Sequence, residues 1–155
     1  MKVVKAKKLH YNSKVMKSVI LRNEKETLEF AQKYATELKQ GDVVVLEGDL
    51  GAGKTTFAKG VAKGLGITEL VTSPTFAIHN VYESGSTVLN HFDFYRLDAS
   101  EAEVMGLHEF FGQDICLVEW AENVRELLPE HYRRVKLTTL GPTERRVELY
   151  EDSCD

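Results

Sequence analysis

The chain has 155 residues, of which 43% are hydrophobic and 28% are charged, a balance typical of one globular domain. Its formal net charge of −4 argues against a dedicated nucleic-acid-binding protein, which usually has a strongly basic domain. No apolar run is long enough to span a membrane, and the two cysteines form neither a disulfide framework nor a metal-binding spacing. These features predict a cytoplasmic protein of one domain.

The net charge conceals an uneven distribution along the chain. Residues 1–17 hold six lysines and no acidic residue, so residues 18–155 carry a net charge of −10. We expect residues 1–17 to be a disordered basic extension and residues 18–155 to form the domain. Because a phosphate backbone repels an acidic surface, this body is poorly suited to binding RNA unaided.

Strands and helices alternate in the first part of the predicted domain. A short strand is expected over residues 18–21, followed by a helix that Asn23 caps and that ends before Gly41. Residues 43–46 are four consecutive apolar residues, as in a strand that is buried on both faces. The next helix is predicted over residues 55–65.

The middle of the chain is predicted to form a hairpin and then a helix. Strands over residues 76–82 and 87–95 are separated by a short glycine-containing turn, which favours antiparallel pairing. Ser100 and Glu103 fit a capping box that opens a helix reaching residue 111.

The last part of the chain returns to strands. Residues 115–118 form an apolar run that ends at Glu119, and residues 132–140 and 145–150 are predicted to pair across the turn at 141–144. The whole pattern predicts an α/β fold with a mixed, partly parallel sheet and antiparallel hairpin additions.

One segment between a predicted buried strand and a predicted helix fits G-x-x-x-x-G-K-[ST] at every position. Its residues are Gly48, Asp49, Leu50, Gly51, Ala52, Gly53, Lys54 and Thr55. Glycines let backbone N–H groups approach phosphates, and a helix N-terminus favours an anion. Lys54 can neutralise the β- and γ-phosphates, and the Thr55 hydroxyl can bind Mg²⁺. The motif predicts a P-loop NTPase-like three-layer fold that binds a nucleoside triphosphate.

A P-loop protein also needs an acidic side chain to hold Mg²⁺, normally at the end of a neighbouring strand. Asp93 and Glu119 are the two candidates, and at least one of them is expected to act as a metal ligand. The GTPase motifs N-K-x-D and D-x-x-G are absent from the sequence, which favours adenine over guanine. Trp120 follows Glu119 directly and either packs at the strand end or contacts a nucleotide or a partner.

Four ordered motifs resemble the TsaE (YjeE) family of bacterial P-loop ATPases over about residues 20–150. These motifs lie at residues 48–56, 72–76, 91–97 and 118–120. The resemblance implies a role in forming N6-threonylcarbamoyladenosine at position 37 of tRNAs that read ANN codons. It implies that the protein acts with TsaD and TsaB, of which TsaD makes the transfer. It also implies slow, Mg²⁺-dependent hydrolysis of ATP that resets the complex, with tRNA contacted only through the partners.

The resemblance also assigns roles to individual residues. It implies catalytic roles for Lys54, Asp93 and Glu119, and Mg²⁺ binding by Thr55 and Glu119. Further implied residues are Glu24, Thr56 and Thr143 at the nucleotide, Ser73, Pro74 and Thr75 in a switch-like loop, and Trp120 beside the catalytic glutamate.

Other interpretations of the motif remain open at this point. A small-molecule kinase would share the P-loop, and a nucleotide-gated binding module would use ATP only to control docking. No arginine is evident as an arginine finger, so slow turnover that partners stimulate is expected. For His91, one interpretation is that its side chain makes a structural hydrogen bond. The arginines of the last predicted hairpin are expected on a solvated face, with contact to a partner or RNA as the alternative; they are Arg133, Arg134, Arg145 and Arg146.

Overall fold

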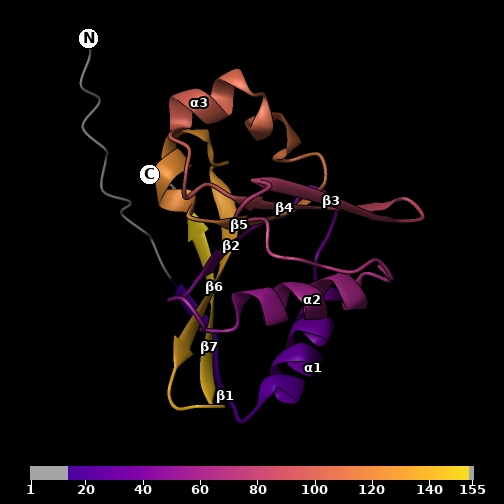
Figure 1. Ribbon diagram of the computed structural model, residues 1–155, viewed down its shortest axis with the longest axis vertical. Helices are drawn as coiled ribbons and strands as arrows, with labels where there is room; N and C mark the ends of the chain where they lie inside the picture. The colour runs from indigo at the N-terminus through magenta and orange to yellow at the C-terminus, as the bar shows by residue number, and fades with distance from the viewer. Residues whose placement is uncertain (1–13, 154–155) are drawn as a thin grey trace.

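The computed structural model describes residues 14–153, which form one seven-stranded mixed sheet with helices on both faces (Figure 1). The elements in chain order are β1 (Lys14–Leu21), α1 (Glu24–Ala35), β2 (Val43–Glu47), α2 (Lys54–Gly64), β3 (His79–Ser84), β4 (Thr87–Asp93), α3 (Ala99–Val104), the 3₁₀ helix η1 (Leu107–Phe110), β5 (Ile115–Glu119), the 3₁₀ helix η2 (Ala121–Leu127), β6 (His131–Thr139) and β7 (Arg145–Ser153). The strands lie in the order β1-β7-β6-β2-β5-β4-β3.

The centre of this sheet is parallel and its two margins are antiparallel. β2 pairs in parallel with both β5 and β6, and β4 pairs in parallel with β5. β7 and β1 extend the sheet beyond β6 as antiparallel strands, and β3 is the antiparallel hairpin partner of β4 at the other margin. The arrangement confirms the predicted α/β class with antiparallel hairpin additions.

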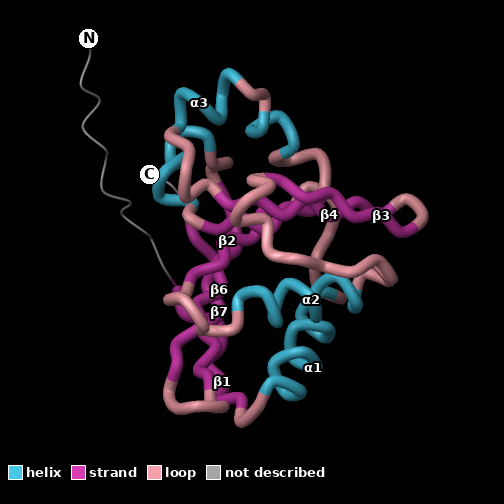
Figure 2. The backbone as a smooth tube through the Cα atoms, in the orientation of Figure 1, coloured by secondary structure: helices cyan, strands magenta, loops and turns pink. Residues whose placement is uncertain are grey.

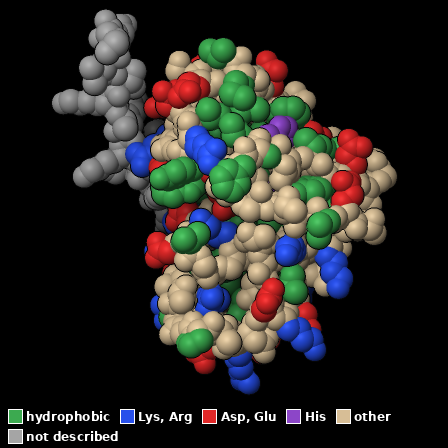
Figure 3. Space-filling model, viewed as in Figure 1, with side chains coloured by type: hydrophobic (Ala, Val, Ile, Leu, Met, Phe, Trp, Pro, Cys, Tyr) green, Lys and Arg blue, Asp and Glu red, His purple; other side chains and the backbone are tan. Residues whose placement is uncertain are grey.

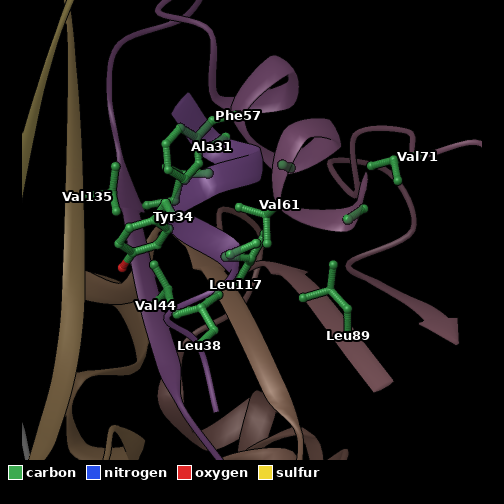
Figure 4. Close-up of a cluster of buried hydrophobic side chains, with 14 of the residues drawn as sticks. Ala31, Tyr34, Leu38, Val44, Phe57, Val61, Val71, Leu89, Leu117 and Val135 are labelled. Atoms are coloured by element: carbon green, nitrogen blue, oxygen red, sulfur yellow. The ribbon is translucent and has the colours of Figure 1, made fainter. Parts of the chain in front are cut away.

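Helices α1 and α2 cover one face of the sheet, and α3, η1 and η2 cover the other (Figures 1 and 2). Figure 4 shows the core on the α1–α2 side, where Phe57 and Val61 of α2 lie one helical turn apart. The Phe57 ring packs 5.7 Å from that of Tyr34 on α1, and Val44 and Leu117 contribute from β2 and β5. Burial of these side chains fixes the position of α2 on the sheet.

The central strand β2 is buried on both faces, as its apolar run predicts. Val43 and Val45 point into the second core, on the side opposite to the α1–α2 layer. There Phe92 and Phe94 stack with their ring centroids 5.3 Å apart, and Cys116 of β5 is fully buried beside them. A strand with helices on both faces therefore lies directly before the glycine-rich motif.

The sheet begins four residues before the predicted domain boundary at residue 18. β1 pairs with β7 over its whole length, from Lys14 opposite Glu151 to Leu21 opposite Arg145. The partner strand is more than 100 residues away in sequence, so local periodicity could not reveal the start of β1. Residues 1–13 of the predicted extension lie outside the described residues.

The capping box is also not where the pattern placed it. The Asp98 side chain accepts a hydrogen bond from the Glu101 backbone N–H (2.8 Å), and the Glu101 carboxylate accepts one from the Asp98 N–H (3.3 Å). Asp98 has the extended backbone that an N-cap requires, whereas Ser100 is already inside α3. The helix ends well before residue 111, because Gly106 has a φ of +72° and breaks it from η1.

The start of α1 agrees with the prediction. The Asn23 side chain caps the helix by accepting a hydrogen bond from the Glu26 N–H at 2.9 Å. β3 begins at His79 rather than near residue 76, because the preceding residues form a turn. None of the helices within residues 14–153 combines the length and the apolar character that a membrane span needs.

Candidate functional site

A cavity of about 1410 Å³ opens at the carboxyl ends of the parallel strands. Its lining includes Glu47, Asp93 and Glu119, which are the last residues of β2, β4 and β5. In open α/β sheets this edge is where ligands bind, because the strand ends and the following loops form a crevice there. The cavity exceeds the roughly 300–1,000 Å³ of ordinary small-molecule pockets, so it has room for a nucleotide-sized ligand.

The glycine-rich loop (residues 48–53) connects β2 to the first residue of α2, Lys54. Gly51 and Gly53 have φ values of +81° and +97°, a region that other residues enter only with strain. The Ala52 N–H donates to the Asp49 carbonyl at 3.0 Å, which closes the turn. The loop therefore brings backbone N–H groups and the N-terminus of α2 to the edge of the cavity.

Asp93 and Glu119 lie side by side at the ends of two parallel strands. They are register partners of β4 and β5, so their side chains lie on the same face of the sheet. Both residues are buried, and Asp93 Oδ1 accepts a hydrogen bond from the Tyr95 N–H at 2.9 Å. The structure thus places both candidate acidic residues beside each other in one cavity.

The Glu119 carboxylate contacts two other side chains. Its Oε1 lies 3.5 Å from Lys54 Nζ, and its Oε2 lies 2.8 Å from His91 Nε2. His91 is fully buried, and its Nδ1 has no hydrogen-bond partner among the described residues. Since a carboxylate only accepts, Nε2 is the His91 nitrogen that donates to it. The contact agrees with the structural hydrogen bond considered for His91 from the sequence.

The cavity gathers most of the other predicted residues, which come from separate parts of the chain. Those in its lining are Glu24, Gly48, Asp49, Leu50, Gly51, Gly53, Thr55, Thr56, Ser73, Thr75, Trp120 and Thr143. Ala52 and Pro74 are buried instead and lie outside the lining. Thr55 is the second residue of α2, so its hydroxyl is placed at the same edge as the two strand-end carboxylates.

The switch-like loop, residues 73–75, is linked to the Asp93 strand through Ile78. The Ile78 N–H donates to the Pro74 carbonyl at 2.7 Å, and the Ile78 carbonyl accepts from the Asp93 N–H at 2.8 Å. Ile78 has a φ of +67°, which is strained for a β-branched side chain. Backbone strain of this kind is common near functional sites, where the surrounding structure enforces it.

Trp120 adopts a φ of +57° directly after Glu119, so the chain turns sharply at the end of β5. Its ring packs 4.8 Å from that of Tyr95, and the residue stays 40% exposed. Leu50 and Phe76 are even more exposed. Figure 3 shows hydrophobic side chains exposed among charged ones on one face of the molecule. Trp120 therefore packs at the strand end and also remains accessible to a ligand or a partner.

The prediction of a solvated face was wrong for most of the arginines on the last hairpin. Arg134 is buried, with its Nη1 3.3 Å from the Glu47 carboxylate, and Arg133 Nε lies 3.5 Å from Asp42. Arg145 reaches the glycine-rich loop and lines the cavity. No signal in the sequence distinguishes these arginines from Arg146, because strand pairing decides which residue meets which neighbour.

Several lining residues were not predicted from the sequence, and besides Glu47 and Arg145 three of them are charged. These are Glu122, Arg125 and Lys136. They come from η2 and β6, elements whose sequences contain no binding motif. Together with Lys54 and Arg145 they make the lining a mixture of basic and acidic groups, which suits an anionic ligand that carries a cation.

A mixed α/β sheet with a glycine-rich loop between its central strand and a helix, facing strand-end carboxylates, defines a P-loop-type fold. Comparison with known proteins narrows this class. The model of the family "Threonylcarbamoyl adenosine biosynthesis protein TsaE" matches residues 21–147. The chain belongs to the TsaE family, whose members act in tRNA threonylcarbamoyladenosine biosynthesis.

Individual relatives agree with this assignment over most of their length. The chain is 49% identical to the tRNA threonylcarbamoyladenosine biosynthesis protein TsaE of Bacillus subtilis, over 86% of this chain and 88% of that protein. It is 40% identical to the TsaE protein of Treponema pallidum, over 84% and 97% respectively. A crystal structure of Bacillus subtilis YdiB is similar in fold, with a TM-score of 0.75 and 39% identity, covering 94% of this chain and 88% of that one.

Proposed function

We propose that this protein binds ATP and slowly hydrolyses it as a component of the bacterial machinery that forms N6-threonylcarbamoyladenosine at position 37 of tRNAs reading ANN codons. In this proposal it works in the cytoplasm with TsaD and TsaB homologues, and it is not itself the threonylcarbamoyl transferase. The observation that carries the ATPase assignment is the ion pair between Lys54 Nζ and Glu119 Oε1, 3.5 Å apart, at the end of the glycine-rich loop. Membership of the TsaE family supports the pathway.

The phosphates are proposed to lie between the glycine-rich loop and the N-terminus of α2. Gly51 and Gly53 carry no side chain that would obstruct the approach, and the positive end of the α2 dipole favours an anion. Lys54 would move from Glu119 toward the β- and γ-phosphates, a short shift for a flexible ammonium group. Glu24 and Thr143, which also line the cavity, are proposed near the base.

The oxygen groups beside Lys54 suit Mg²⁺. Thr55, Glu119 and Asp93 offer a hydroxyl and two carboxylates at one edge of the cavity, and hard oxygen ligands are what this ion prefers. Within residues 14–153 no three His, Cys, Asp or Glu side chains are arranged to hold a metal ion. Bound there, Mg²⁺ would supply positive charge that offsets the negative charge of the transferring phosphate.

Hydrolysis in this site would depend on positioning and electrostatics rather than on covalent catalysis. Lys54 and the loop N–H groups would stabilise charge that develops on the phosphate oxygens. Asp93 and Glu119 would orient water and the metal shell from the two strand ends. The exposed side chains of Leu50 and Trp120 in the cavity lining, and of Phe76 next to the switch-like loop, support docking of a partner that stimulates turnover.

The decisive experiment measures ATP turnover by the purified chain with and without TsaB and TsaD homologues. We expect slow release of free phosphate by the chain alone and a clear increase with the partners. Many turnovers per second by the isolated chain would contradict the dependence on partners. Labelled phosphate on another product would indicate a kinase, and nucleotide-dependent docking without turnover would indicate a binding module.

Two substitutions test the assignment of the site. Lys54→Ala removes a charge-assisted contact worth about 1.5–3 kcal/mol, so we expect ATP affinity to fall about 10- to 100-fold. Glu119→Ala should reduce Mg²⁺-dependent hydrolysis more than nucleotide binding. The control is Lys59→Ala, which removes an exposed charge from the same helix and should leave both unchanged. Undiminished binding by Lys54→Ala would overturn the phosphate site, and equal losses in Glu119→Ala would count against its role at the metal.

A further inference from the structure

Arg145, at the start of β7, donates hydrogen bonds to four backbone carbonyls in two separate segments. Its Nη2 and Nε reach the carbonyls of Gly51 and Ala52 in the glycine-rich loop, at 3.0 and 3.1 Å. Its Nη1 reaches the carbonyls of Gly141 and Glu144 in the β6–β7 turn, both at 2.9 Å. One guanidinium therefore joins the glycine-rich loop to the β6–β7 turn, which carries Pro142 and Thr143 of the cavity lining.

These contacts orient the peptide groups of the loop. In a planar trans peptide the N–H points opposite to the C=O, and residues 14–153 contain no cis peptide. When Arg145 holds the Ala52 carbonyl, the N–H of Gly53 points away from the guanidinium. The Ala52 N–H is already used by Asp49, so the Gly53 N–H is the one that this contact leaves available to a ligand.

The glycine-rich loop needs such support from outside. Gly51 and Gly53 populate many backbone conformations, and no heavy atom lies within 4 Å of the position that a Cβ would take at either residue. Packing therefore holds the loop at the buried Ala52 but restricts the two glycines on either side of it little. A guanidinium has five N–H donors in a planar, rigid fork, whereas a lysine ammonium is a single nitrogen that cannot span four carbonyls in this way.

We infer that Arg145 is a positioning residue for phosphate binding, which preorganises the glycine-rich loop and couples it to the neighbouring β6–β7 turn. The inference rests on the proposed function for the nature of the ligand, since phosphate groups are what the oriented N–H groups would bind. Arg145 acts through the backbone of the loop and contacts no phosphate in this role. Its effect is therefore on the conformation of the loop before the nucleotide arrives.

The test compares Arg145→Ala and Arg145→Lys with Arg146→Ala, which removes an exposed arginine from the next position of the same strand. Calorimetric titration with ATP should show affinity at least about tenfold weaker for both Arg145 variants and unchanged for Arg146→Ala. Without nucleotide, hydrogen exchange of the amides of residues 50–54 should be faster in both Arg145 variants, while exchange in β2 stays unchanged.

Chemical rescue separates this role from a general loss of stability. Millimolar methylguanidinium should restore ATP affinity in Arg145→Ala, whereas methylammonium should not, because only the planar fork can bridge the carbonyls. If Arg145→Ala does not fold, Arg145→Lys supplies the affinity and exchange measurements. ATP affinity within twofold of the wild type, or unchanged exchange in the loop, overturns the inference. Failure of the wild-type chain to bind ATP would instead overturn the proposed function.

Discussion

At the scale of single residues, the Glu119 carboxylate is held from two sides by groups that are far away in sequence. His91 donates to one oxygen at 2.8 Å, and Lys54 lies 3.5 Å from the other. A buried carboxylate is stable only when such groups compensate its lost hydration. His91 Nδ1 has no hydrogen-bond partner in the described part of the chain, so the contact with Glu119 is the polar interaction of its ring.

Replacing His91 should therefore affect both stability and the site. In His91→Leu the carboxylate loses a buried hydrogen bond, so the free energy of unfolding should fall by about 1.5–3 kcal/mol in urea titrations. Hydrolysis by this variant should also need more Mg²⁺, because Glu119 is less well positioned. His91→Gln, whose amide N–H₂ can reach a similar place, should lose less of both. Equal stability of His91→Leu and the wild type would contradict this interpretation.

At the scale of elements, α1 and α2 approach each other closely at two glycines of α2. A Cβ at Gly60 would lie 2.6 Å from Ala31 Cβ and 2.7 Å from the Leu28 carbonyl oxygen. A Cβ at Gly64 would likewise collide with the Gln32 carbonyl oxygen. These glycines set the spacing of the two helices, and hence the distance between Glu24 at the start of α1 and the glycine-rich loop.

Gly60→Ala tests this close approach. Alanine favours a helix over glycine by about 1 kcal/mol, but the collision should cost more, up to about 3 kcal/mol. We expect a net loss of stability in denaturant titrations. Lys59→Ala, at an exposed position of the same helix, should change stability by less than about 0.5 kcal/mol. A Gly60→Ala variant more stable than the wild type would show that the helices can separate at little cost.

The segment between the switch-like loop and β3 offers a second test at this scale. Ile78 has a φ of +67°, and a non-glycine residue in this region bears about 1–2 kcal/mol of strain. Because both lack the isoleucine side chain, Ile78→Gly and Ile78→Ala differ mainly in that strain. We expect the glycine variant to be more stable by about 1 kcal/mol. At the exposed neighbour Ala77, a change to glycine should lower stability by up to about 1 kcal/mol. If the alanine form were more stable than the glycine form at both positions, strain at Ile78 would be ruled out.

At the scale of the whole molecule, Cys116 reports on the integrity of the central sheet. It lies in the middle of the parallel strands, fully buried, and its Sγ donates to the Phe110 carbonyl at 3.5 Å. Burial, with a smaller contribution from Asp114, raises the pKa of the thiol from 9.0 to about 12. The thiolate is the reactive form, and at pH 8 its population is about a thousandfold lower than for a thiol with a pKa of 9.0.

We predict that Cys116 reacts with N-ethylmaleimide only when the domain unfolds. Cys154 lies outside the described residues, so the measurement uses a Cys154→Ser background, and addition of Cys116→Ser supplies the blank. Labelling at pH 8 should be slow in buffer and rapid in denaturant. Rapid labelling of native Cys116 would contradict its burial.

The raised pKa also predicts a pH dependence of stability. Since the pKa of the Cys116 thiol is higher in the folded state, its contribution to stability should be lost as pH rises from about 9 to about 12.

The strengths and the errors of the sequence analysis have different physical origins. Residues 43–46 and 115–118 were predicted as strands because a bounded apolar run of four residues is too short for a helix and fits a strand buried on both faces. The capping box was misplaced because two overlapping segments fit its pattern, and only the backbone at Asp98 distinguishes them. The start of β1 was missed because its pairing partner is β7, at the other end of the chain.

Sequence patterns were sufficient to predict the α/β class, the glycine-rich loop at residues 48–53 and the two strand-end carboxylates. The loop and each strand-end carboxylate depend on contiguous residues, and the α/β class depends on the order of such segments, so local chemistry is sufficient to predict them. The contact of His91 with Glu119, and the contact of Arg145 rather than Arg146 with the loop, could be seen only in the folded chain. Such contacts depend on strand order and on register, where a shift of one residue would turn every side chain to the opposite face of the sheet.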